Sequence, residues 1–162
     1  MSGASTWSLG EDDARRIQAV LGAFLGEAGA RTTLLVDRSG QMLATAGETP
    51  GFDHVAFASL TAADFSANDQ LARMLGEAEF GALFHQGERE SLYLADVARR
   101  VILVVLFDNR TTLGLVKLRV RRAVTELSAV FQELFQQAGS APRVEAGFVG
   151  EAEHEIDRLF RA

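Results

Sequence analysis

The sequence predicts an α/β protein built as a sandwich, in which three helices cover a five-stranded antiparallel sheet in the order α-β-β-α-β-β-β-α. Three observations predict this fold class. Apolar residues recur at helical spacing in three long segments. Five short strand-like stretches lie between them and are separated by turn-forming residues. The chain of 162 residues, 48% of them hydrophobic, suits one domain, since about 150 residues is a common domain size.

A helix and a hairpin are expected to open this domain. Ser8 and Glu11 have the spacing of a capping box, and Gly29 stands where a glycine would end the helix. Residues 32–37 and 41–46 predict two strands, because turn-forming residues separate them. Apolar residues on one face support the helix: Ile17, Val20, Leu21, Phe24 and Leu25.

The second helix is expected over residues 53–75, where β-branched residues are scarce and alanines are many, and Gly76 would end it. Small side chains occupy more than one face of this helix. Packing of the helix against the rest of the molecule would account for one of these faces. A stripe at helical spacing marks the helix: Ala56, Leu60, Ala63, Ala67 and Leu71. A second small face is interpreted as free for a partner: Ala62, Ser66 and Arg73, with Asp69 and Gln70 beside it.

Three further strands and a third helix complete the expected order. Residues 83–86, 91–95 and 101–107 predict a three-stranded meander, and the last stretch is apolar on both faces, as a central strand is. Residues 108–112 supply a turn and an N-cap for the third helix. Its apolar stripe is Val116, Val120, Ala123, Leu127, Val130 and Leu134. The predicted domain therefore spans residues 11–137, after a flexible start over 1–10.

The meander leaves one sheet edge without a partner, and an exposed edge is a template for pairing with another chain. We therefore predict a homodimer with two-fold symmetry, in which like edges join into one continuous sheet. The residues expected at this edge are Leu83, Phe84, His85 and Gln86.

Composition and motifs argue against catalysis. There are no cysteines, and the net charge of −6 disfavours nucleic acid, whose phosphates call for basic residues. The chain has no phosphate-binding loop, no G-x-S-x-G element, and no apolar run of the roughly 20 residues that span a bilayer. Its three histidines, His54, His85 and His154, lack the spacing of metal ligands. We expect a cytoplasmic protein that is not an enzyme and has no cofactor.

A basic cluster stands out in this acidic protein: Arg110, Lys117, Arg119, Arg121 and Arg122. One interpretation is a solvated helix face. Another is a surface that attracts an acidic partner or an anionic lipid. A third concerns Arg110 alone, which could act as an arginine finger supplied to a GTPase.

The C-terminal part has its own pattern. Residues 138–150 have the composition of a linker, and residues 151–162 form a short acidic and amphipathic motif. The apolar positions of this motif are Ile156, Leu159 and Phe160. Two interpretations stay open, which are docking into the groove of a partner and folding back onto the domain.

Ordered motifs along the chain resemble the Roadblock family, which is related to the Longin fold, and within it the MglB-type proteins. The first two are LVDRSGQ over 35–41 and ASLTA over 58–62. The others are LGEAEF over 75–80, FHQGERESLY over 84–93, VVLFDNRTTLGLVKLR over 104–119 and EIDRLF over 155–160. Each motif is weak alone, but their order is specific.

The resemblance implies a homodimer that binds a Ras-like GTPase of the MglA type in bacterial polarity or motility, with enrichment at a cell pole. It implies stimulated GTP hydrolysis without an arginine finger. The implied contacts on the second helix are Ala62, Ser66, Asp69, Gln70 and Arg73, and those of the tail are Ile156, Leu159 and Phe160. Relatives often have Ala or Gly where this chain has Ser66, Asp69 and Gln70, so partner choice can differ. The alternative is a dimeric scaffold that leaves nucleotide turnover unchanged.

Overall fold

The computed structural model describes residues 8–139 and has the predicted order of elements. Residues Leu9–Gln132 form one compact unit, which contains the whole sheet, and residues 133–139 belong to a second unit. The elements are α1 (Glu11–Ala28), β1 (Thr32–Asp37), β2 (Met42–Gly47), α2 (His54–Met74), β3 (Ala82–Gln86), β4 (Ser91–Val97), β5 (Val101–Phe107) and α3 (Leu113–Gly139).

The five strands form one antiparallel sheet in the order β2-β1-β5-β4-β3. Strand β5 lies at its centre, between β1 and β4, and is almost fully buried. This confirms the prediction made from its run of apolar residues, because a central strand covered on both faces needs no polar side. Strands β2 and β3 are the two edges.

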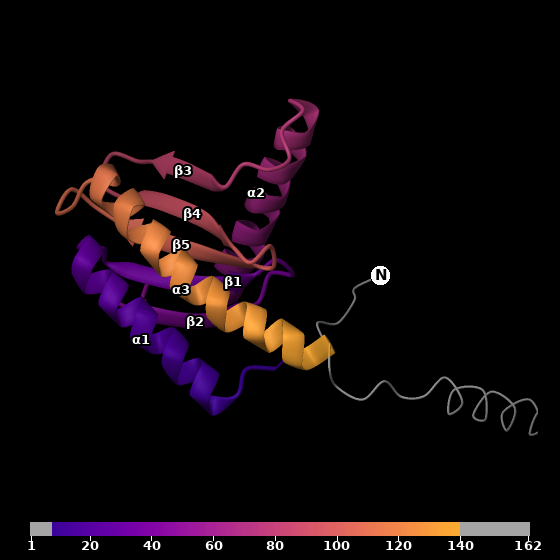
Figure 1. Cartoon of the computed structure of the whole chain (residues 1–162). Helices are drawn as coiled ribbons and strands as arrows, with labels where there is room; N and C mark the ends of the chain where they lie inside the picture. Colours follow the sequence, from indigo (N-terminus) through magenta and orange to yellow (C-terminus); the bar gives the residue numbers. More distant parts are fainter. Residues whose placement is uncertain (1–7, 140–162) are drawn as a thin grey trace, which may run out of the picture. The chain divides into compact units, whose positions relative to one another are not determined.

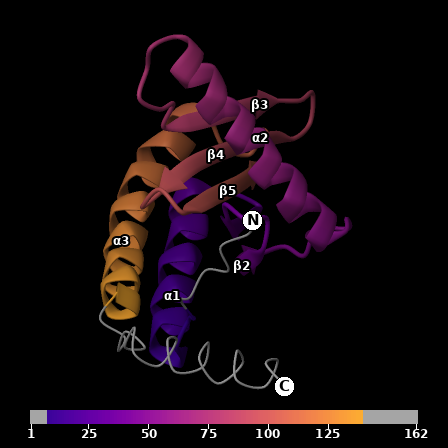
Figure 2. The same ribbon diagram turned by 90° about the vertical axis from the view of Figure 1, so that its right-hand side faces the viewer.

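Helices cover both faces of the sheet. Helix α1 and the part of α3 up to Gln132 lie side by side on one face, and α2 crosses the other (Figures 1 and 2). Under α2, Phe65 is fully buried in a cluster with side chains of β1, β4 and β5. The cluster consists of Leu34, Val36, Ala58, Phe65, Leu94, Ile102 and Val104.

The capping-box prediction for α1 was wrong. The N-cap is Gly10 in an extended conformation, and no side chain caps the helix. Instead, three acidic residues in the first turn, Glu11, Asp12 and Asp13, stabilise the helix by interacting with the positive end of its dipole. At the other end the prediction is confirmed, because Gly29 has the left-handed conformation (φ 66°) and its N–H donates to the carbonyl of Leu25.

Helix α2 begins after Asp53, whose carboxylate accepts hydrogen bonds from the N–H groups of Val55 (2.9 Å) and Ala56 (3.3 Å). Its predicted stripe does not face the sheet. All five members of that stripe are exposed, and the opposite face packs inward. The inward face consists of Ala58, Thr61, Ala62, Phe65, Asn68 and Ala72.

Helix α3 follows its prediction. The hydroxyl of Thr112 accepts a hydrogen bond from the N–H of Leu115 (3.2 Å), and every residue of the predicted stripe is buried. The helix runs to Gly139, two residues past residue 137, at which the predicted domain ends. The C-terminal motif over 151–162, with Ile156, Leu159 and Phe160, lies outside the described residues.

Candidate docking surface on helix α2

Helix α2 presents an apolar surface to solvent along its outer side. Leu60 is 70% exposed, Leu71 is 56% exposed and Met74 is 83% exposed. Ala56, Ala63 and Ala67 are exposed at the same helical spacing; we call the six residues together the outer stripe of α2. Contiguous exposed apolar surface of this kind marks sites of protein contact.

The contact residues predicted on α2 do not all lie on its surface. Ser66, Gln70 and Arg73 are exposed and stand beside the outer stripe. Ala62 is only 8% exposed, because it belongs to the inward face. It is therefore not part of an exposed small face, which corrects that expectation.

Asp69 is held by Arg38, a residue of the turn between β1 and β2. The guanidinium of Arg38 donates one hydrogen bond to Asp69 and another to Asp96, which lies near the end of β4. It also lies over the ring of Phe65, 4.6 Å from the centroid. The Arg38 cluster, as we call Arg38, Asp69, Asp96 and Phe65, therefore fixes α2 to the turn and to the sheet.

Electrostatics in the Arg38 cluster favour the charged arginine. Burial by itself lowers the pKa of Arg38, but the hydrogen bonds to Asp96 and Asp69 outweigh it and leave the pKa raised. In the sequence, Arg38 stands out only as one of the turn-forming residues between the first two predicted strands, within the motif over 35–41. Its partners lie 31 and 58 residues away along the chain, so spacing gave no signal for the cluster.

The edge strand β3 lies next to α2 in space. Within residues 8–139 it pairs only with β4, so its other edge is unpaired, as predicted for Leu83, Phe84, His85 and Gln86. His85 Nε2 lies 2.6 Å from a carboxylate oxygen of Asp64 on α2. The ring of Phe84 stacks with that of Phe107 on β5. The unpaired edge and the outer stripe therefore belong to neighbouring elements.

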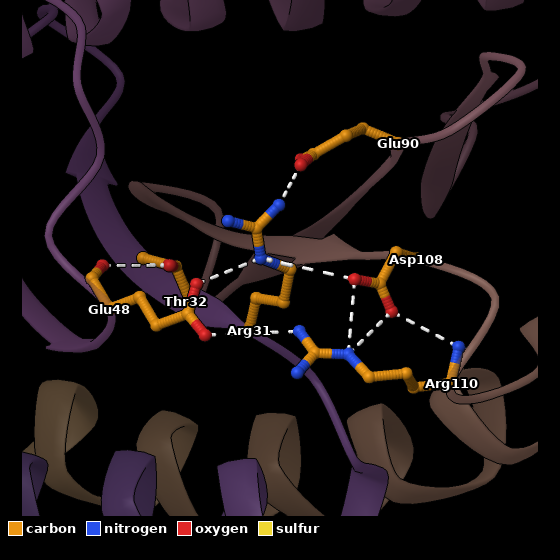
Figure 3. Close-up of polar contacts among 6 residues, drawn as sticks. All are labelled: Arg31, Thr32, Glu48, Glu90, Asp108 and Arg110. Carbon is orange, nitrogen blue, oxygen red and sulfur yellow. Dashed lines mark hydrogen bonds and ion pairs between the residues drawn. The ribbon is translucent and has the colours of Figure 1, made fainter.

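A second polar cluster lies at the other end of β1 (Figure 3). Arg31 donates a hydrogen bond to Glu48 (2.9 Å), forms an ion pair with Glu90, and lies 4.0 Å from Asp108. Arg110 donates hydrogen bonds to Asp108 (3.0 Å), which lower the pKa of that carboxyl and raise the pKa of Arg110. We call these five charged residues the Arg31 cluster. Arg110, the candidate arginine finger, is engaged within it.

Two other kinds of site are absent from the described residues. Among residues 8–139, no helix has the length and apolar character needed to cross a bilayer. Over the same range, no group of three or more histidine, aspartate or glutamate side chains could hold a metal ion.

Comparison with known proteins places these features in a family context. The model of the Roadblock/LC7 domain matches residues 16–107. The chain is similar in structure to Myxococcus xanthus MglB, with 45% identity over 74% of this chain and 97% of that chain, and a TM-score of 0.71. It is similar to the gliding protein MglB from Thermus thermophilus, with 37% identity over 78% and 96%, and a TM-score of 0.73.

Two further structures extend the comparison. An MglB described as having a tetrameric arrangement is 37% identical over 79% of this chain and 96% of that chain, with a TM-score of 0.74. A Roadblock/LC7 domain from Streptomyces avermitilis, 11% identical over 71% and 97% with a TM-score of 0.64, shares the fold alone. No curated protein sequence matches the chain significantly.

Proposed function

Since the chain belongs to the Roadblock/LC7 domain family, we propose that it is a homodimeric regulator of a Ras-like GTPase of the MglA type. The regulator binds the GTPase on α2 and stimulates GTP hydrolysis in bacterial polarity or motility. The observation that carries this proposal is an exposed apolar stripe on a helix that lies beside an unpaired strand edge. The similarity of the chain to MglB proteins, at 37% to 45% identity, supports an MglA-type GTPase as the partner.

The dimer is proposed to form along β3. Pairing of two β3 edges would satisfy the free backbone groups and continue the sheet across the two-fold axis. Asp64 contacts His85 on β3, so the flank of α2 that carries Asp64 points toward this edge. Leu60 lies one turn before Asp64 on that flank, and Leu71 lies two turns after it. A second copy would cover both leucines.

The rest of the outer surface of α2 is then available to the GTPase. Ser66, Gln70 and Arg73 supply polar groups beside the small residues Ala63 and Ala67, which allow close approach. Asp69 would help to fix the position of this surface, because its carboxylate accepts a hydrogen bond from Arg38.

Stimulation would not need a catalytic group from this chain. A regulator can act by binding the hydrolysis-competent conformation of the GTPase more tightly than the other conformations. The engagement of Arg110 with Asp108 and Glu48 is consistent with this mode, because a finger must reach outward. The C-terminal positions Ile156, Leu159 and Phe160 are proposed as a second contact with the GTPase.

The test is GTP turnover by a cognate MglA-type GTPase, with and without this protein. Ser66→Arg and Gln70→Arg should each abolish binding and stimulation, because a long charged side chain would lose its hydration in the interface. Ala129→Arg, at an exposed position of α3, is the matched control and should keep both. Melting temperature and light-scattering mass should stay unchanged in all three variants.

The outcomes separate the alternatives. Stimulation by both α2 variants at the level of the wild type would place the contact elsewhere. Binding of the GTPase with no change in turnover would favour the dimeric scaffold. A monomer mass at micromolar concentration would contradict the dimer along β3.

A further inference from the structure

Helix α3 carries a concentration of positive charge that the GTPase proposal does not use. Lys117, Arg119, Arg121 and Arg122 lie within six residues, and no acidic residue occurs between residues 113 and 125. The whole chain has a net charge of −6, so this region opposes the overall sign.

The four cations differ in their surroundings. Arg119 lies 3.9 Å from Glu27 of α1, and Arg122 donates a hydrogen bond to Glu126 (3.2 Å). Lys117 and Arg121 are exposed, and neither forms an ion pair within the part of the chain that the structure describes. They are i,i+4 neighbours and therefore share one side of the helix.

An apolar side chain stands among these charges. Leu118 is 58% exposed, and it lies three residues before Arg121 and four before Arg122, so all three occupy adjacent positions on the outer surface. Gly114, one turn earlier, has open space around it. We call Lys117, Leu118, Arg121 and Arg122 the basic strip.

We propose that the basic strip binds an acidic segment of a partner protein, with carboxylates for the cations and an apolar side chain against Leu118. Arginine suits carboxylates because its planar group can donate two parallel hydrogen bonds. Two of the four residues of the strip are arginines, and Lys117 adds a further cation. The exposed leucine supplies apolar area, which charges alone lack.

A narrow segment fits this surface better than an anionic membrane. A flat bilayer would meet α1 together with α3, because the two helices lie side by side on one face of the sheet (Figure 2). Helix α1 carries four acidic residues, three of them in its first turn, against two arginines, so its net charge of −2 would disfavour negative headgroups. A single segment can contact α3 and avoid that turn.

The location of the basic strip would allow two partners at once. It lies on the face of the sheet opposite α2, as the arrangement of the helices shows (Figure 1). If α2 binds the GTPase, a point that rests on the proposed function, the acidic segment would recruit the regulator to a place in the cell without displacing the GTPase.

The test uses fluorescence anisotropy with the full chain and a labelled synthetic helical peptide of about 15 residues, which has glutamates at i,i+4 spacing and one leucine. The wild-type protein should bind this peptide with an affinity that falls as salt is added. Lys117→Glu combined with Arg121→Glu should weaken binding at least tenfold, about 1.4 kcal/mol. Leu118→Ser should weaken it less.

The control is Arg15→Glu combined with Arg89→Glu, which makes the same change in net charge at exposed positions outside the strip. It should bind within about twofold of the wild type, since distant exposed charges are screened. An equal loss in the control, or no binding by the wild type, would overturn the proposal. Binding to vesicles of phosphatidylserine and phosphatidylcholine, but not to the peptide, would also overturn it.

A final experiment repeats the peptide titration in the presence of the GTPase. Peptide affinity unchanged by saturating GTPase would support separate sites, and competition would contradict them. Because the peptide measurement needs no GTPase, its result stands even if the proposed stimulation of GTP hydrolysis fails.

Discussion

Strand β1 has an arginine at each end, and carboxylates from distant elements hold both of them. Arg31 precedes the strand and Arg38 follows it. In the Arg31 cluster the ion pairs of Arg31 reach half-exposed carboxylates, since Glu48 is 53% and Glu90 is 50% exposed, although Arg31 and Asp108 are 33% and 19% exposed. In the Arg38 cluster, Asp69 and Asp96 are 18% and 15% exposed.

This difference in exposure decides what each cluster contributes. Exposed ion pairs are worth about 0–1 kcal/mol, because water and salt screen them. Shielded pairs cost much more to break, because removing one partner leaves a charge with poor solvation. The Arg38 cluster also fixes the proposed docking helix, whereas the Arg31 cluster joins loops at the far end of β1. The two ends should therefore respond very differently to the same kind of substitution.

The largest effect is expected for Arg38→Met, which keeps much of the side-chain volume but leaves Asp69 and Asp96 without their shared cation. The free energy of unfolding should fall by about 3 kcal/mol, at the lower end of the range for a broken buried pair. Urea unfolding at fixed protein concentration measures this change. A loss below about 1 kcal/mol would mean that the cluster behaves like an exposed pair.

Asp69→Asn is expected to have an intermediate effect, because Asp96 still balances Arg38 and the amide oxygen can still accept a hydrogen bond. The unfolding free energy should fall by about 1–2 kcal/mol. Affinity for the GTPase should change by less than about threefold, which is under 1 kcal/mol. A larger loss of affinity in a stably folded variant would make Asp69 a direct contact, as the family resemblance implies.

The layers of the fold could be predicted from the sequence, since strand β5 and the stripe of α3 each show one strong hydrophobic pattern. The orientation of α2 could not. Its inward face includes Thr61 and Asn68, while its outer side carries Leu60 and Leu71, so the apolar stripe marks the exposed surface. When an apolar surface is kept for a partner, periodicity identifies the helix but not its buried side.

The candidate site could be predicted only in part, because some of its features depend on local patterns and others on contacts between distant segments. The β3 edge follows from strand order, which local patterns determine. The burial of Ala62 and the engagement of Asp69 depend on how α2 is rotated and on contacts with the turn at Arg38. Such contacts between distant segments have no signature in the spacing of residues along one helix.

Arg31→Gln should change the free energy of unfolding only slightly, in contrast to Arg38→Met. The variant removes contacts to two half-exposed glutamates, so the unfolding free energy should fall by no more than about 1 kcal/mol. Stimulation of GTP hydrolysis should match the wild type, because none of the ion pairs of the cluster within the described residues involves α2. A loss near that of Arg38→Met would show that exposure does not separate the two ends of β1.

The smallest effect concerns the pH dependence of Asp108. Hydrogen bonds from Arg110 lower the pKa of Asp108 below its ordinary value of 3.8, so the folded state favours the ionised carboxylate. A lowered pKa in the folded state contributes stability above the unfolded pKa, and this contribution is lost as the pH falls through the folded pKa. Arg110→Gln should therefore raise the pKa of Asp108, and the stability difference between variant and wild type should shrink below about pH 4. NMR titration of the Asp108 carboxyl carbon measures the shift, with Arg89→Gln as the control. If Asp108 had the same pKa in the wild type and in Arg110→Gln, the pair would be too well solvated for Arg110 to change the pKa of Asp108.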